Sequence, residues 1–348
     1  MYQPTEDLKN GTLMSFSIAW LFPHANLALD PSNRLRRYQI SNYLNNLTGI
    51  VTQSKNFFFY GKKENLKEEL LNFDVIVFFN INELDLQLMS FLNEQGKITI
   101  FDHAENIFGL GHEDAIMRAV TAITCCSNNL AQRTYNYLVE TYHIEKPIFV
   151  IRDPIEDSAL DNHAYPHGDN LALVMGMGAN VQYVMPTLER YCVAADYKMM
   201  LLTEAGFSYP RHRVEYWTPY SWINHALECS VALCFHNGDQ FPAKGNVKVT
   251  TPMSLGLPVI ACPIDAYTEA ISNGNTGFIA SHGEDWVRAL NLLKNKGFRS
   301  LLGMRAKRAA ITRYSTEQIS LDYLSMIAHL DYPFKGLNNG RYGRLHRT

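Results

Sequence analysis

The chain of 348 residues is long enough for two domains of ordinary size. Hydrophobic residues make up 47% of it, which allows sizeable buried cores and excludes a disordered or fibrous protein. The 31 basic and 34 acidic residues give a net charge of −3. A protein that binds duplex nucleic acid needs a basic surplus to neutralise phosphates, so nucleic acid is not an expected partner.

The start of the chain lacks the pattern of a membrane anchor or a secretory signal. The apolar stretch Phe16–Phe22 is too short to span a bilayer. Residues Met1–Asn10 hold two acids and one lysine, whereas a secretory signal begins with basic residues. We therefore expect a cytoplasmic protein with no transmembrane segment, and contact with a membrane surface remains open.

The cysteines fit that compartment as reduced thiols. None of them forms a C-x-x-C pair, which argues against a metal site. Most lie in or beside apolar runs, which is typical of small buried side chains rather than metal ligands. The six are Cys125, Cys126, Cys192, Cys229, Cys234 and Cys262.

Short β-rich runs alternate with helical patterns along the first half of the chain. Apolar residues recur at near-helical spacing between Leu35 and Leu47, and Leu84–Leu92 predicts another helix. Apolar strands separated by helices indicate a parallel sheet that is covered on both faces. The predicted strands are Phe16–Phe22, Phe57–Tyr60, Val75–Phe79, Ile98–Phe101, Ala122–Cys125 and Ile148–Ile151.

A polar, turn-rich segment from Asp153 to Asn170 separates this half from a second alternating series. Two helices close that series, Trp286–Leu293 and Ile319–Leu330, and a capping box of Ser315 and Gln318 begins the last one. The predicted strands of the second half are Leu171–Met175, Met199–Thr203, Val214–Trp217, Val231–Phe235, Val259–Cys262 and Phe278–Ala280.

This order predicts an α/β protein of two Rossmann-like, doubly wound domains with a ligand cleft between the ends of their strands. The N-terminal domain would span residues 1–155 and the C-terminal domain residues 165–315. A closing helix would follow over 316–332, and the basic, glycine-rich residues 333–348 would form a flexible tail.

The segment Lys244–Ala280 carries the most chemical information. Lys244 and Lys248 lie four residues apart around a predicted helix start near Asn246. Free backbone N–H groups and the helix dipole favour an anion at such a start, and two ammonium groups strengthen the preference for a diphosphate. Gly256 and then Pro258 end this helix. Pro252 lies inside it, so the helix is either kinked or starts later.

The same segment resembles the donor-binding half of GT-B glycosyltransferases of the retaining family 4, or group 1, type. The shared pattern is S-L-G-L-P-V-I-A at Ser254–Ala261, Y-T-E-A-I at Tyr267–Ile271 and N-G-N-T-G-F-I-A at Asn273–Ala280. Weaker likenesses are Asn33–Arg36, Cys126–Leu130 and Arg313–Ser315. The resemblance covers about residues 15 to 330. It implies the GT-B fold, with an acceptor domain followed by a nucleotide-sugar donor domain.

The chain departs from the usual pattern of that family at one place. Many members carry two glutamates, eight positions apart, that hold the sugar and the ribose. Here the second falls on Thr251 and the first near Ala243 or Lys244. Polysaccharide and cell-surface glycan transferases have a variant with lysine and asparagine in this place, and the present chain resembles that variant more closely.

The resemblance implies roles for further residues, each of which also has a plainer explanation. Glu269 would contact the donor sugar, or it would only stabilise the first turn of a short helix. Gly176 and Gly178 would let the donor approach the backbone, although G-x-G alone is a weak dinucleotide signal. Trp217 would frame the nucleobase, together with Tyr220, and Tyr267 would cover the sugar, or these rings would pack in the core. The donor-binding set is Gly176, Gly178, Trp217, Lys244, Asn246, Lys248, Thr251, Tyr267 and Glu269.

Three residues of the first half are expected to bind the acceptor: Arg34, Arg36 and, more weakly supported, His24. The two arginines follow the first strand, in a loop that faces the cleft in this fold, and the alternative is that they are ordinary surface charges. His103 lies at the end of a strand and is a catalytic candidate or a structural histidine. The predicted catalytic set is His103, Lys248 and Glu269.

We expect no metal and no cofactor, with the nucleotide diphosphate sugar as a co-substrate. The chain has no D-x-D motif, so lysines, arginines and backbone dipoles would meet the charge of the leaving diphosphate. The expected function is transfer of a sugar to a glycan or lipid-linked acceptor, with retention of configuration implied by the resemblance. The alternatives are a catalytically silent sugar- or nucleotide-binding protein and a nucleotide-sugar 2-epimerase.

Overall fold

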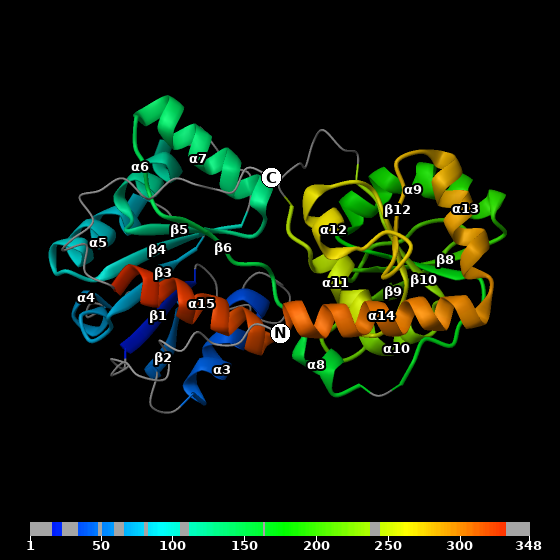
Figure 1. Ribbon diagram of the computed structural model, residues 1–348, viewed down its shortest axis with the longest axis horizontal. Helices are drawn as coiled ribbons and strands as arrows, with labels where there is room; N and C mark the ends of the chain where they lie inside the picture. Colours follow the sequence, from blue (N-terminus) through cyan, green and yellow to red (C-terminus); the bar gives the residue numbers. More distant parts are fainter. Residues whose placement is uncertain are drawn as a thin grey trace.

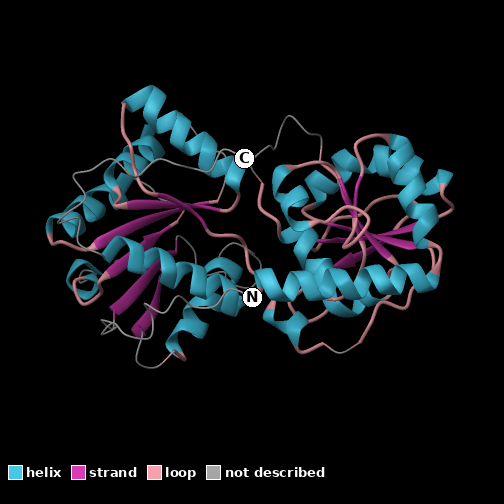
Figure 2. Cartoon of the chain, viewed as in Figure 1, coloured by secondary structure: helices cyan, strands magenta, loops and turns pink. Residues whose placement is uncertain are grey.

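Two parallel six-stranded sheets, each covered by helices, form the two halves of the molecule (Figures 1 and 2). This computed structural model describes residues 16–22, 34–47, 51–58, 66–79, 83–104, 111–162, 164–236 and 244–331. His24, part of the expected acceptor site, and the predicted tail 333–348 lie outside the described residues.

The first sheet has the strand order β2-β1-β3-β4-β5-β6, and all of its neighbouring strands run parallel. Side chains of β1 alternate between its faces, because Ile18 and Trp20 join one core cluster and Ala19 and Leu21 the other. The strands are β1 (Phe16–Phe22), β2 (Val51–Phe58), β3 (Val75–Phe78), β4 (Ile98–His103), β5 (Ala122–Cys125) and β6 (Ile148–Val150).

The helices of the first half divide between these two faces. Residues of α4, α5, α6 and α7 pack in one cluster, and residues of α3 pack in the other together with the last helix of the chain, α15. The elements are η1 (Arg34–Gln39, a short π-helix), α3 (Ile40–Asn45), α4 (Leu66–Leu70), α5 (Glu83–Glu94), α6 (Gly111–Ala119), α7 (Asn128–Tyr142) and α15 (Thr316–Asp331). The short helix α8 (Asp157–Leu160) packs instead in the core of the second half.

The second sheet has the order β12-β11-β10-β7-β8-β9. Its first strand, β7, therefore lies in the middle, with the next two strands on one side and the last three on the other. This is the strand order of dinucleotide-binding Rossmann domains. The strands are β7 (Leu171–Met175), β8 (Lys198–Thr203), β9 (Arg213–Tyr216), β10 (Val231–Cys234), β11 (Val259–Ala261) and β12 (Phe278–Ile279).

One large hydrophobic cluster fills the second half, and its helices surround the sheet. The long helix α14 leads toward the first half, where α15 continues across the first sheet (Figure 1). The helices are α9 (Gly178–Ala194), α10 (Trp222–Leu227), α11 (Val247–Ser254), α12 (Asp265–Ala270), α13 (Gly283–Leu293) and α14 (Lys296–Tyr314).

The largest departure from the predicted strands is β2, which we expected over Phe57–Tyr60. It begins at Val51 and pairs with β1 along its length. Because β2 is an edge strand, polar residues such as Gln53 and Lys55 are tolerated there, and they hide the strand from an apolar pattern. At the other end of the chain, the Oγ of Ser315 accepts a hydrogen bond from the N–H of Gln318 at 3.2 Å, as expected for a cap of α15.

Across the described ranges, none of the helices has both the length and the low polarity that crossing a bilayer requires.

Candidate functional site

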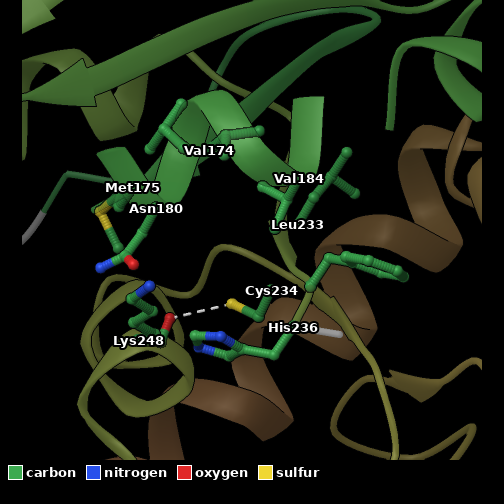
Figure 3. A pocket seen from close by; sticks show the side chains of 10 residues that line it. Val174, Met175, Asn180, Val184, Leu233, Cys234, His236 and Lys248 are labelled. Carbon is green, nitrogen blue, oxygen red and sulfur yellow. Dashed lines mark hydrogen bonds between the residues drawn. The ribbon is translucent and has the colours of Figure 1, made fainter. Parts of the chain in front are cut away.

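A pocket opens at the carboxyl ends of β7 and β10, the two strands between which the strand order of the second sheet reverses. Open α/β sheets bind ligands at this point, because the loops on either side turn in opposite directions and leave a crevice. The pocket encloses about 300 Å³, counting the space open to solvent. Its lining residues are Val174, Met175, Asn180, Val181, Val184, Leu233, Cys234, Phe235, His236 and Lys248 (Figure 3).

Lys248 supplies the cation of this pocket. Its amine points toward the amide of Asn180 in Figure 3, with the His236 ring beside them. Among the residues that the structure describes, no carboxylate lies within ion-pair distance of Lys248. Burial lowers the pKa of its ammonium group below the usual value, and the neighbouring charge of Lys244 lowers it further. An anion in the pocket would relieve both costs.

The local sequence explains how α11 presents this lysine. The helix begins after Asn246 and runs through Pro252, so it does not start later, which was one of the two alternatives. Pro252 has no N–H and leaves the carbonyl of Lys248 without its helical partner. The thiol of Cys234, at the end of β10, donates to that carbonyl at 3.0 Å. Because Pro252 has no N–H, the carbonyl of Lys248 is available to bond α11 to β10, the strand beside the pocket.

Gly176 leaves room for the Lys248 amine. Its φ of +152° is rare for residues with a side chain, and a Cβ there would lie 3.1 Å from Nζ of Lys248. Gly178 is different, because its N–H donates to both carboxylate oxygens of Glu204, at 2.9 and 2.7 Å. The start of α9 therefore already holds an anionic group of the protein itself. The G-x-G turn makes space for Lys248 and does not present a free helix terminus.

His236 is a pocket residue that the sequence analysis missed. It follows β10, is 7% exposed, and its ring centroid lies 6.1 Å from that of Tyr267. Burial, followed by the charges of Lys248 and Lys244, lowers its pKa to about 3. The ring is therefore neutral at physiological pH, and Lys248 is the cation among the residues that line the pocket. The signal available in the sequence was a histidine shortly after a predicted strand of the second half.

Three expected donor contacts lie inside the protein. We expected Tyr267 to cover a sugar, but its ring is 1% exposed and belongs to the core of the second half. It would need a rearrangement to contact a ligand. Thr251 is 6% exposed on the buried side of α11, and its Oγ1 has no hydrogen-bond partner among the residues that the structure describes. Asn246 is also buried and bonds to the backbone of Asp153.

Glu269 does not point into the pocket but binds the other half of the molecule. Its carboxylate accepts from Nη2 of Arg152 at 2.8 Å and from Nδ2 of Asn128, at the start of α7, at 2.8 Å. Asp265, on the same helix α12, accepts from Nδ2 of Asn129 at 2.7 Å. In this structure Glu269 therefore links the two halves, and a direct role at the donor sugar stays a prediction.

The two described residues of the expected acceptor site are engaged in internal contacts. Arg36 is 1% exposed, and its guanidinium bonds to Asp102 and Asp153, which corrects the expectation that it faces the cleft. Arg34 pairs with Glu156, and its guanidinium lies 4.6 Å from the ring centroid of Trp217, in the second half. Trp217 therefore contacts the first half, and a nucleobase would have to share it with Arg34.

His103, at the end of β4, is a buried neutral side chain. It is 2% exposed, and burial lowers its pKa to about 4 although the neighbouring Asp102 raises it. A neutral imidazole can accept or donate a proton, but this ring does not reach the pocket around Lys248. Elsewhere in the described ranges, no three His, Cys, Asp or Glu side chains gather in a way that could hold a metal ion.

No family model matches the chain, and no curated protein matches it by sequence. Solved structures do match. A glycosyltransferase from Rickettsia africae superposes with a TM-score of 0.68 at 11% identity, over 91% of this chain and 99% of that one. Sucrose-phosphate synthase from Thermosynechococcus elongatus gives 0.62 at 14% identity, over 90% and 99%.

The chain has the GT-B fold.

HepE from Anabaena, in complex with UDP-glucose, has a TM-score of 0.63 at 10% identity and covers 90% of this chain and 100% of its own. TarM is a longer protein, of which the present chain covers 54% at a TM-score of 0.55 and 12% identity. At these identities the likeness establishes the fold, and the activity has to be argued from the site.

Proposed function

We propose that the protein is a glycosyltransferase of the retaining family 4 type, which moves a sugar from a nucleotide diphosphate sugar to a glycan or lipid-linked acceptor without a metal ion. The observation that supports this most is Lys248, a lysine without a carboxylate partner among the described residues, which lines a pocket at the switch point of a Rossmann-like sheet. Solved structures of the same fold include complexes with UDP and with UDP-glucose.

The diphosphate is the part of the donor that this pocket suits. The diphosphate carries the negative charge of the donor, and Lys248 is the cation among the residues that line the pocket. That negative charge restores to Lys248 the electrostatic stabilisation that burial removes. Asn180 and neutral His236, which also line the pocket, add hydrogen-bonding groups.

The proposed reaction is cleavage of the bond between the sugar and the diphosphate, with Lys248 stabilising the negative charge that develops on the leaving group. Charge stabilisation by groups already in place is a large contribution to catalysis in sites that exclude water. The acceptor would approach from the first half, so the sugar would pass from a donor bound at the second sheet to an acceptor bound at the first. Contacts such as Arg152–Glu269, which hold the halves together, would help to keep water from the donor.

A second candidate is a silent binding protein that keeps the nucleotide pocket without turnover. It is favoured by Thr251, which stands where many family members have a glutamate and whose hydroxyl has no hydrogen-bond partner in the described part of the chain. The link of Glu269 to Arg152 and Asn128 favours it too, because that acid is occupied.

Release of the nucleoside diphosphate separates these two functions. The protein would be incubated with UDP-glucose, UDP-N-acetylglucosamine and GDP-mannose, each with and without a pool of glycan and lipid-linked acceptors. A transferase releases nucleoside diphosphate at a rate that rises with one acceptor class. A binder raises its own melting temperature with the nucleotide but releases nothing.

A further inference from the structure

The short stretch Ile151–Asp153, which joins the two halves, is held from both sides by buried side chains. Arg36 reaches it from the first half, and Asn246 reaches it from the second. Asn246 also directly precedes α11, two positions before Lys248. The joint between the halves and the start of the lysine-bearing helix are therefore one continuous set of contacts.

On the first side, Arg36 fixes the carboxylate of Asp153. Its Nη1 donates to Oδ1 of Asp153 at 2.7 Å and to the carbonyl of Ile151 at 2.9 Å. Its Nε and Nη2 donate to the two oxygens of Asp102, at 3.0 and 2.6 Å. Arg36 and Asp102 are 1% and 0% exposed, so this anchor is enclosed by protein and shielded from competing water.

On the second side, Asn246 binds the backbone of the same residue. Its Oδ1 accepts from the N–H of Asp153 at 3.1 Å, and its Nδ2 donates to the carbonyl of Asp153 at 3.2 Å. The same Nδ2 lies 3.1 Å from Oγ1 of Thr250, one turn into α11. A Cβ on Gly245 would lie 2.0 Å from Oδ2 of Asp153, so the chain before α11 runs directly against that carboxylate.

We propose that Asp153 is a positioning residue for the donor site. Its side chain is fixed by Arg36, its backbone fixes Asn246, and Asn246 sets the start of α11 and so the place of Lys248. This proposal rests on the proposed function, because it assumes that Lys248 contacts the diphosphate. The Arg152–Glu269 contact between the halves is more exposed, with 33% and 21% of the side chains accessible.

The test measures UDP binding by calorimetry and the melting temperature for Asp153→Ala, Asp153→Asn and Gly245→Ala. We expect Asp153→Ala and Gly245→Ala to weaken UDP binding about tenfold, a common size for the coupling between residues in one contact network. Asp153→Asn keeps an oxygen that accepts from Arg36, so this variant should retain most of the UDP affinity of the parent protein. Asp161→Ala removes an exposed acid of the same linker and is the matched control, with unchanged affinity.

A double-mutant cycle with Lys248→Ala shows whether Asp153 acts through the lysine. In the Lys248→Ala background, Asp153→Ala should cause no further loss of UDP affinity, whereas a general structural defect would add to it. Equal losses in both backgrounds, or normal UDP binding by Asp153→Ala and Gly245→Ala, would overturn the positioning role and leave the proposed function standing. Normal UDP binding by Lys248→Ala would overturn both.

Discussion

Arg36 in the first half and Lys248 in the second are both cations at the ligand-binding edge of a parallel sheet, yet they are in opposite situations. Arg36 is enclosed, with four of its five N–H donors bound to two carboxylates and a carbonyl. Lys248 is largely buried at a pocket, and among the described residues it has no carboxylate partner. The first charge is used to build the protein, and the second is available to a ligand.

The two pKa shifts record the same difference. Burial lowers the pKa of Arg36, but the charges of Asp102 and Asp153 outweigh this effect. The pKa of Arg36 is therefore well above its usual value. For Lys248 the effect of burial prevails, and the pKa of its ammonium group lies below the usual value. A charge near a cleft is therefore a ligand-binding candidate only when the protein itself leaves it uncompensated.

The largest effect should follow from removing the compensated cation. Arg36→Ala leaves Asp102 and Asp153 with less compensation in the interior, and we expect a loss of about 3–5 kcal/mol in the free energy of unfolding. Urea denaturation measures it, with Arg308→Ala, an exposed arginine on α14, as the control. A loss below about 1 kcal/mol would place Arg36 in the class of surface charges.

A smaller effect should appear in the pH dependence of stability through His103. Its pKa is about 4 in the folded protein and near 6.5 when unfolded, so the unfolded chain takes up the proton first as pH falls. The stability that the neutral His103 ring contributes is complete above about pH 6.5 and is lost as the pH falls toward 4. Between pH 7 and 5 this one group should cost about 2 kcal/mol.

His103→Gln removes that titration, so its unfolding free energy should fall about 2 kcal/mol less than that of the parent between pH 7 and 5. If the unfolding free energies of the two proteins changed equally with pH, the His103 ring would be accessible to protons in the folded state.

Glu204 is an acid beside the second sheet, and its carboxylate binds the start of α9. Because the site assigned to the diphosphate is at Lys248 and not at this helix terminus, Glu204→Gln should leave UDP affinity within about twofold. The stability loss should stay within about 1 kcal/mol, the range for a carboxylate at an exposed helix start. A large gain in UDP affinity would mean that the carboxylate had been excluding the diphosphate from α9.

Removal of metal ions should have the smallest effect. If Lys248 and backbone dipoles stabilise the leaving group, EDTA should change the rate of nucleoside diphosphate release by less than about twofold. Complete loss of release, restored by manganese alone, would contradict that role for the lysine.

Most strands of both sheets could be predicted from the sequence, because a parallel strand covered on both faces must be apolar along its length. The predicted strands of the second half agree with the structure to within one residue at each end. The polar edge strand β2 escaped this pattern. Arg34–Gln39 was expected as a cleft-facing loop that runs into a helix, and it forms a short π-helix that turns Arg36 inward.

The site was predictable only in part. Spacing placed Lys248 at the start of a helix, and the structure places it at the pocket. Sequence cannot show whether a charge has an internal partner, since Arg36 meets Asp102 and Asp153 from 66 and 117 positions away. Nor could it show that Tyr267 faces the core, because a tyrosine suits either side of a short helix.

Calorimetric titration of UDP into the parent protein, Lys248→Ala and Lys294→Ala tests the central claim most directly. Lys294 is an exposed lysine outside the pocket and controls for loss of one positive charge. We predict that Lys248→Ala weakens binding by about 1–3 kcal/mol, the contribution of a charge-assisted hydrogen bond, while Lys294→Ala binds as the parent does. Equal affinity of folded Lys248→Ala and the parent protein would contradict the assignment of this pocket to the diphosphate.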